Sequence, residues 1–219
     1  MNEKMVQNVI DYAKKLSEEG LASENASITF RHENELYTTK QGVDFANLTA
    51  DDVLFADLDG FDPDKLDDRT AKKLGGDVYA LNLVDGADAV IRIDTDYTLA
   101  CAEKGKSVPP VLDDMSQILG VKIKCAASSA PKDLVKALAG KRACLIKGEG
   151  ALTVGRSLDE AFTAAMVMEK ACRTHVRVTA LGGSHNLGFL DANLQHFIYK
   201  IKYSKTNQAA KIAKEQEEA

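Results

Sequence analysis

The sequence places a carboxylate at the tip of a short turn between two apolar runs. Residues 143–155 read ACLIKGEGALTVG, so Glu149 stands between two glycines. A carboxylate in this place can ligate a metal ion, act as a general acid or base, or serve only as a turn residue. The two-residue centre Gly148-Glu149 predicts a β-hairpin with a type II′ turn, because that turn takes glycine at its first central position.

Cysteine and histidine, the residue types that most often bind transition metals, show no metal-binding spacing. The four cysteines are far apart and form no C-x-x-C pair, and the histidines form neither H-x-H nor H-E-x-x-H. We therefore predict reduced, buried thiols in a cytoplasmic protein. A zinc ribbon or a thioredoxin-type site is not expected.

The composition indicates a soluble protein with a single core. The 219 residues suit one domain, which we place at 1–203, followed by a charged tail at 204–219. The net charge of −5 argues against nucleic acid or an anionic membrane as a partner, since both favour a basic face. No apolar run reaches the ~18 residues of a membrane span.

Hydrophobic periodicity predicts the helices and strands that must position the candidate site residues. The motif S-x-x-E at 157–160 is a capping box, which starts the longest predicted helix. Helices are also predicted at 6–16 and after Pro131, and strands at 26–31, 35–39, 88–93, 121–125 and in the hairpin. This order predicts an α/β fold with a central, mostly antiparallel sheet flanked by helices, an α/β/α sandwich.

Several segments, taken in order, resemble the class II aldolase and adducin family. They are VIDYAKKLSEEGLASENASITF, LYTTKQGVDFANLTADDVLFAD, DAVIRID, VPPVLDDMSQILGVKI and CLIKGEGALTVGRSLDEAFTAAMVMEKACR. The family includes sugar-phosphate aldolases, related epimerases and the non-catalytic head domain of adducin. The resemblance implies the same sandwich fold and a homo-oligomer, commonly a tetramer with pockets between neighbouring subunits.

In the enzymes of this family three histidines hold a zinc ion, two in an H-x-H pair and one in an N-H-G turn. The resemblance places R-I-D at 92–94 on the pair and G-E-G at 148–150 on the turn. The S-S-E segment that holds the family's catalytic acid has no match between residues 60 and 80. The resemblance therefore implies that the zinc site is degenerate and that no zinc cofactor is bound.

By the same resemblance, Arg92, Asp94 and Glu149 would meet in one pocket. In one interpretation, Arg92 lies between the two carboxylates and supplies the positive charge of the missing zinc, or binds an anionic ligand. In a second, the carboxylates bind a hard ion such as Mg²⁺, Mn²⁺ or Ca²⁺, which the guanidinium would repel. In a third, Glu149 is an exposed turn residue.

The phosphate-binding turn of the family, G-N-x-S, reads E-N-A-S at 24–27. Asn25 and Ser27 match this turn and could form a remnant anion site, although a glutamate replaces the glycine. Hydrogen bonds of an ordinary turn or cap explain the same two residues. Tyr97 would lie near the mouth of the pocket, where it would either contact a ligand or pack.

These replacements predict a catalytically inactive family member that acts as a binding or regulatory domain, with a small anionic ligand. The alternative is a lyase or isomerase for a small phosphorylated hydroxy-carbonyl sugar. In that case Arg92, Asp94 and Glu149, or a hard metal ion, would take the place of zinc. A purely structural oligomer is the third hypothesis.

Overall fold

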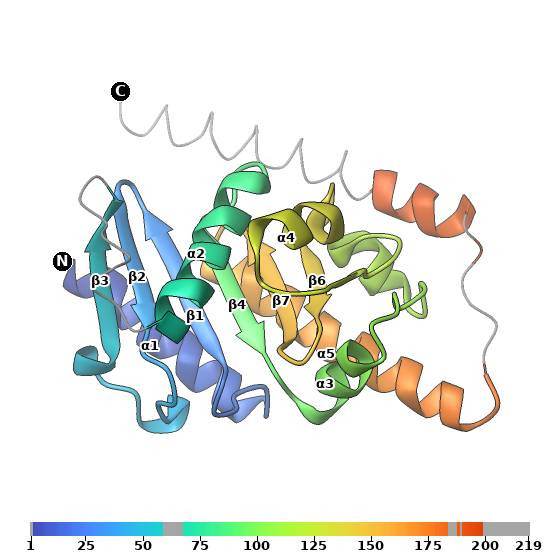
Figure 1. Cartoon of the computed structure of the whole chain (residues 1–219), viewed down its shortest axis with the longest axis horizontal. Helices are drawn as coiled ribbons and strands as arrows, with labels where there is room; N and C mark the ends of the chain where they lie inside the picture. The colour runs from blue at the N-terminus through green and yellow to red at the C-terminus, as the bar shows by residue number, and fades with distance from the viewer. Residues whose placement is uncertain (1, 59–67, 184–187, 189, 199–219) are drawn as a thin grey trace.

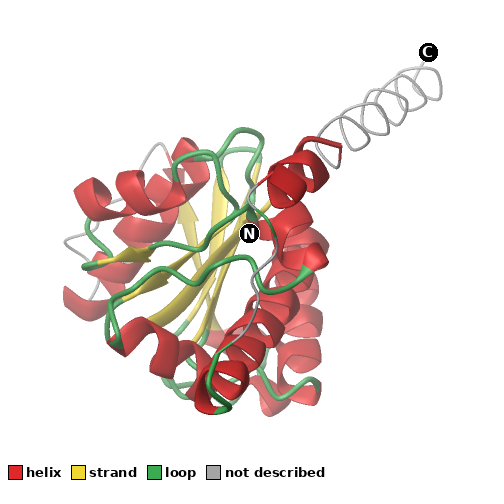
Figure 2. Ribbon diagram, turned by 90° about the vertical axis from the view of Figure 1, so that its right-hand side faces the viewer, coloured by secondary structure: helices red, strands yellow, loops and turns green. Residues whose placement is uncertain are grey.

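The computed structural model describes residues 2–58, 68–183, 188 and 190–198. They form a seven-stranded sheet with the strand order β3-β2-β1-β4-β7-β6-β5 and with helices on both faces (Figures 1 and 2). Neighbouring strands in this sheet are antiparallel except β5 and β6. The predicted mostly antiparallel α/β/α sandwich is therefore confirmed.

The elements follow the predicted order along the chain. The strands are β1 (Ser27–His32), β2 (Glu35–Thr39), β3 (Val53–Asp57), β4 (Ala89–Ile93), β5 (Cys125–Ala126), β6 (Ala143–Ile146) and β7 (Gly150–Gly155). The helices are α1 (Glu3–Glu18), α2 (Asp68–Leu83), α3 (Asp96–Glu103), α4 (Pro131–Leu138) and α5 (Leu158–Ala180). Shorter helical turns span Phe45–Asn47, Ala50–Asp52 and Met115–Leu119, and residues 190–198 are helical.

The strand predicted at 121–125 is shorter than expected. Only Cys125 of this segment belongs to β5, while Ile123 makes a single bridge to Val108. β5 lies at the edge of the sheet, where β6 is its neighbour. The helix predicted from Ser157 is confirmed, because the Ser157 side chain accepts a hydrogen bond from the Glu160 N–H at 3.2 Å and caps α5.

The turn between β6 and β7 has three residues rather than the predicted two. Ile146 pairs with Gly150, so residues 147–149 make the connection, and the Glu149 N–H donates to the Ile146 carbonyl at 3.0 Å. Gly148 (φ +72°) is therefore the second central residue, whereas a type II′ turn needs positive φ at the first. The predicted turn type was wrong because the turn starts one residue earlier, at Lys147.

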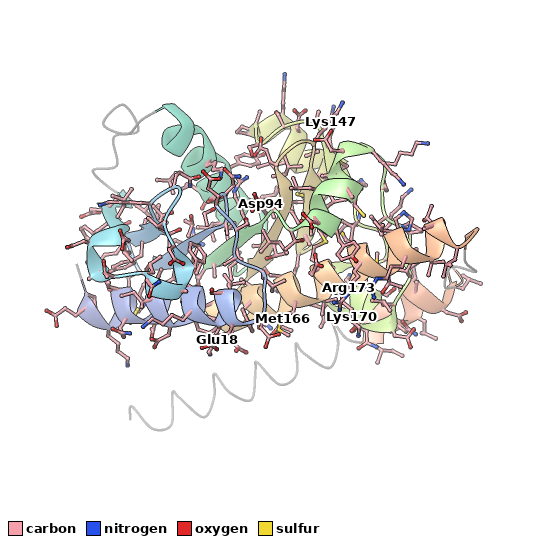
Figure 3. The ribbon with its side chains drawn as sticks, turned by 90° about the horizontal axis from the view of Figure 1, so that it is seen from below. Glu18, Asp94, Lys147, Met166, Lys170 and Arg173 are labelled. Carbon is pink, nitrogen blue, oxygen red and sulfur yellow. The ribbon has the colours of Figure 1, made fainter. Side chains whose placement is uncertain are left out.

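The two faces of the sheet carry separate apolar layers. Alternate residues of β4 point to opposite faces, so Ile91 and Ile93 pack with α1, α3 and α5, while Val90 packs with α2 and α4. Figure 3 shows α1 and α5 on one side of the sheet and α2 on the other. Arg92 has the same parity as Val90, so its guanidinium points into the layer under α2.

No helix within the described ranges is long and apolar enough to cross a membrane. The domain boundary predicted at residue 203 and the charged tail predicted at 204–219 lie outside the described residues.

Candidate functional site

Three neighbouring strands bring most of the predicted site residues to one end of the sheet. In the antiparallel register of β1 and β4, Ser27 lies directly opposite Arg92. Asp94 comes just after β4, Asn25 just before β1, and Glu149 just before β7, which pairs with the other side of β4. The strand ends therefore gather residues that are far apart in the sequence.

Each of the three nitrogen atoms of the Arg92 guanidinium donates to a protein acceptor. Nε donates to Asp77 Oδ1 at 2.7 Å, and Nη1 donates to Ser129 Oγ at 2.9 Å and to Glu149 Oε2 at 3.3 Å. Nη2 reaches the Lys73 carbonyl at 3.5 Å, and the Ser129 hydroxyl donates to Glu149. The Arg92 side chain is only 4% exposed, so these contacts replace the water that the charge has lost.

Asp77 is the acidic partner that the sequence interpretation missed. Its side chain is 3% exposed, and its second oxygen accepts a hydrogen bond from the Thr29 hydroxyl at 2.7 Å. It belongs to α2 and follows buried Leu74 by one helical turn, with Leu81 one turn further on. A carboxylate on the apolar stripe of a predicted helix is a signal that could have identified it.

A glycine allows α2 to come this close to the guanidinium. A Cβ atom on Gly76 would lie 2.9 Å from the Ser129 carbonyl and 3.1 Å from Arg92 Nη2. At the other side, a Cβ on Gly150 would lie 2.4 Å from the Ile93 carbonyl and 2.8 Å from Asp94 Cα. The backbone of α2 and the start of β7 thus touch the site directly, with no room for side chains.

Asp94 takes part in a different set of contacts from Arg92. Asn25 Nδ2 donates to Asp94 Oδ2 at 2.9 Å, and Lys73 Nζ holds the same turn through the Asn25 carbonyl at 3.0 Å. Asp94 Oδ1 and Ser27 Oγ are buried and have no hydrogen-bond partner among the described residues. Figure 3 shows Asp94 in the middle of the molecule, between the two helical layers. The carboxylates that pair with Arg92 are thus Asp77 and Glu149.

The structure does not bring Tyr97 to the Arg92 network. Tyr97 lies on α3, where its hydroxyl accepts a hydrogen bond from Arg177 Nη2 at 3.2 Å. The Arg177 guanidinium carbon also lies 5.6 Å from the centre of the tyrosine ring. These contacts join Tyr97 to α5.

The donors at this site do not fit a zinc ion. Zinc sites in proteins are built mainly from cysteine and histidine, and the Arg92 guanidinium lies where it repels a second cation. Cys144 lies near Arg92, but burial raises the pKa of its thiol to about 12 and keeps it neutral. In the part of the chain that the structure describes, no three His, Cys, Asp or Glu side chains are grouped to hold a metal ion.

Chemically, the site has two unlike halves. Nε and Nη1 of the guanidinium are held by Asp77, Ser129 and Glu149, and Nη2 has the longer contact with the Lys73 carbonyl, so only Nη2 is left for a ligand. Asp94 Oδ1 and Ser27 Oγ are acceptor and donor atoms that a ligand hydroxyl could satisfy.

Comparison with known proteins identifies the family to which this chain belongs. The sequence profile of the Class II Aldolase and Adducin N-terminal domain matches residues 7–176. A solved L-fuculose 1-phosphate aldolase is similar with a TM-score of 0.79 and 20% identity, over 91% of this chain and 98% of that one. No curated protein sequence matches significantly.

Two bacterial structures agree. L-fuculose-1-phosphate aldolase from Thermus thermophilus has a TM-score of 0.69 and 20% identity, over 85% of this chain and 100% of that one. Sugar-phosphate aldolase from Thermotoga maritima has a TM-score of 0.61 and 16% identity, over 84% and 98%. At such identities the structures establish only a shared fold, whereas the profile covers most of the chain. The protein is therefore a member of the class II aldolase and adducin family.

Proposed function

We propose that this chain is a catalytically inactive member of the family that acts as a binding or regulatory domain. In this proposal Arg92 occupies the place of the catalytic zinc ion as a fixed structural charge. The observation that carries it is the engagement of Nε and Nη1 of the guanidinium, which donate to Asp77, Ser129 and Glu149 at 2.7–3.3 Å.

The energetics of the network support an inactive site. A catalytic metal acts as a Lewis acid because it keeps an open position for a substrate oxygen. For Arg92 to take that role, it would have to leave buried Asp77, and breaking a buried ion pair costs about 3–5 kcal/mol. Binding of a substrate carbonyl would therefore have to offset this loss before any chemistry begins.

Three measurements test the proposal, all on protein purified without any chelator. They are elemental analysis, thermal unfolding with Zn²⁺, Mn²⁺ or Mg²⁺, and cleavage of L-fuculose 1-phosphate with and without those ions. We expect no stoichiometric metal, no metal-dependent rise in Tm and no cleavage. One ion per chain that is lost in both Glu149→Ala and Asp94→Ala, together with turnover, would overturn it.

One observation favours a second candidate, a lyase or isomerase for a small phosphorylated hydroxy-carbonyl sugar. Asp94 Oδ1 is a buried carboxylate oxygen without a described partner, and such an atom can accept a proton from a substrate hydroxyl. Turnover that persists without metal and falls about a hundredfold in Asp94→Asn would favour this candidate. Turnover equal in Asp94→Asn and the wild type would exclude Asp94 as the base.

We also propose that the protein is a cytoplasmic homo-oligomer, with a tetramer expected from the family. The helix at 190–198 supports assembly, because Leu190, Leu194, Phe197 and Ile198 are 81%, 56%, 61% and 54% exposed and lie at helical spacing. Light scattering on the full chain tests the state, and Phe197→Ser should weaken assembly if this helix contributes. A monomer at micromolar concentration would contradict it.

A further inference from the structure

A cavity lies at the opposite end of the sheet from Arg92. It has a volume of about 370 Å³ and lies where α2 and α4 end and β6 is about to begin. The segment 83–85 on its wall leads into β4, whereas Arg92 and Asp94 lie where β4 ends. The volume falls within the range of small-molecule sites, roughly 300–1,000 Å³.

One wall of this cavity is apolar. It is formed by the end of α2, by the turn at Met115–Leu119 and by the last turn of α4, through Leu83, Val84, Ile118 and Leu138. Leu83 is 36% exposed, so its side chain is accessible from the cavity side. Such a wall favours the apolar body of a ligand.

The other wall carries a lysine that has no acidic partner among the described residues. Lys141 lines the cavity, and its stem packs over Gly120, whose Cβ, if present, would lie 3.1 Å from Lys141 Cγ. Within the described ranges, no carboxylate forms an ion pair with Lys141, Lys122 or Lys124. Burial, and then repulsion by Lys124 and Lys122, lowers the pKa of Lys141.

The neighbouring arginine is only partly neutralised. Arg142 Nη1 lies 3.5 Å from Glu160 Oε2, but Glu160 is already bound by Arg156 through contacts of 2.5–3.0 Å. One carboxylate is therefore shared between two arginines. Lys141 and Arg142 on the cavity wall face a single carboxylate of that wall, Asp85, so positive charge prevails there.

Two simpler explanations do not account for Lys141. Lysines beside an edge strand prevent pairing with other chains, and this explains Lys122 and Lys124 next to β5. Lys141, however, leads into β6, which is an interior strand. The carboxyl end of α4 favours a nearby cation weakly. This effect does not explain why the stem of Lys141 is packed over Gly120 on the cavity wall.

We propose that this cavity is a binding site for a small ligand that carries an anionic group, a phosphate or a carboxylate, on an apolar body. The anion would lie against Lys141 and Arg142, and the apolar body against Leu83, Ile118 and Leu138. An anion relieves the repulsion among the lysines, and the apolar wall adds affinity that an inorganic ion does not gain.

Calorimetric titration with phenyl phosphate as the probe tests this site. Inorganic phosphate (the anion alone), benzyl alcohol (the body alone) and phenylacetate (the carboxylate form) are compared on the full chain. We expect saturable binding of phenyl phosphate, phenylacetate or both. Inorganic phosphate and benzyl alcohol should bind about tenfold more weakly. Lys141→Met should lower the affinity for the anionic probe about tenfold. Lys141→Arg should retain binding, and Lys106→Met, an exposed lysine elsewhere, should not change it.

Three results would overturn the proposal. The first is no saturable binding of either anionic probe. The second is equal affinity in Lys141→Met and Lys106→Met. The third is an affinity for inorganic phosphate equal to that for phenyl phosphate, which would mean that any anion is attracted to the lysines. Asn25→Ala separates the two ends of the sheet: if it abolishes binding while Lys141→Met does not, the anion binds beside Asp94 instead.

Discussion

The two ends of the central sheet differ in whether their cationic side chains are paired with carboxylates. At the end of β4, Arg92 and Asp77 are 4% and 3% exposed, and every nitrogen of the guanidinium has an acceptor. At the other end, Lys141 lines a cavity of about 370 Å³ and faces two further lysines without an ion-pair partner among the described residues. At the first end the cation is paired with carboxylates, whereas at the second end Lys141 lines an open cavity without such a partner among the described residues.

This contrast shows why family membership does not locate a binding site. At the end where the sequence resemblance would place the zinc site, the cation Arg92 is paired with the carboxylates of Asp77 and Glu149. A functional pocket keeps space and charges that a ligand can use, because binding must gain more than it disrupts. By this physical criterion, the Lys141 cavity is better prepared for an anionic ligand than the Arg92 network.

The largest effect is expected when the Arg92 charge is removed. Arg92→Met leaves Asp77 buried with no cation, and the free energy of unfolding should fall by about 3–5 kcal/mol. Urea denaturation measures this, and the double variant Arg92→Met/Asp77→Asn should recover part of the loss. A loss below about 1 kcal/mol would mean that the pair is not the tightly coupled unit described here.

Two adjacent glycines of α2 should respond with opposite signs. Gly76→Ala places a Cβ against the Ser129 carbonyl and the guanidinium, and should cost about 1–3 kcal/mol. Gly75→Ala is the matched control, since nothing lies within 4 Å of its Cβ, and it should add roughly 0.5–1 kcal/mol through helix propensity. Equal effects in thermal unfolding would contradict the close approach of α2.

Glu149 should matter less than Asp77. Its side chain is 29% exposed, so Glu149→Gln keeps the shape, loses one charge and leaves the neutral amide partly hydrated. We expect a loss of about 1 kcal/mol in urea denaturation. A loss as large as that of Arg92→Met would make Glu149, rather than Asp77, the main partner.

At the other end, removal of a charge should stabilise the protein. The lowered pKa of Lys141 means that the folded state binds this proton less tightly than the unfolded chain. The charged form therefore costs stability at neutral pH, and the cost disappears as pH rises through the lowered pKa towards 10.5. Lys141→Met should add about 0.5 kcal/mol at pH 7 and less at high pH. A destabilised variant in matched thermal melts would contradict this sign.

Local sequence patterns predicted most of the fold. Ser157 with Glu160 fixed the start of α5, and the alternation around Ile91 and Ile93 identified β4 as a buried strand. The turn at 147–149 was misjudged because two glycines flank Glu149, and only the register of Ile146 with Gly150 decides between them. Neighbouring residues cannot supply that register.

The site was predicted less completely than the fold. The family resemblance led us to expect Arg92, Asp94 and Glu149 in one pocket and Asn25 and Ser27 in a phosphate-binding turn. The structure gathers these residues at one end of the sheet. The partner Asp77 and the hydroxyl of Ser129 come from α2 and from the loop before α4. Their approach depends on how these helices pack on the sheet, which periodicity does not encode.

The distant origin of the strands around Arg92 also has a consequence for folding rates. The network requires that β1 has paired with β4 and that β4 has paired with β7, contacts that join widely separated parts of the chain. Such contacts form late, after the entropy of closing long loops has been overcome. The contacts of Arg92 with Glu149 and of Asp77 with Thr29 join residues that are 57 and 48 positions apart. Loss of these contacts should therefore speed unfolding and leave the folding rate almost unchanged.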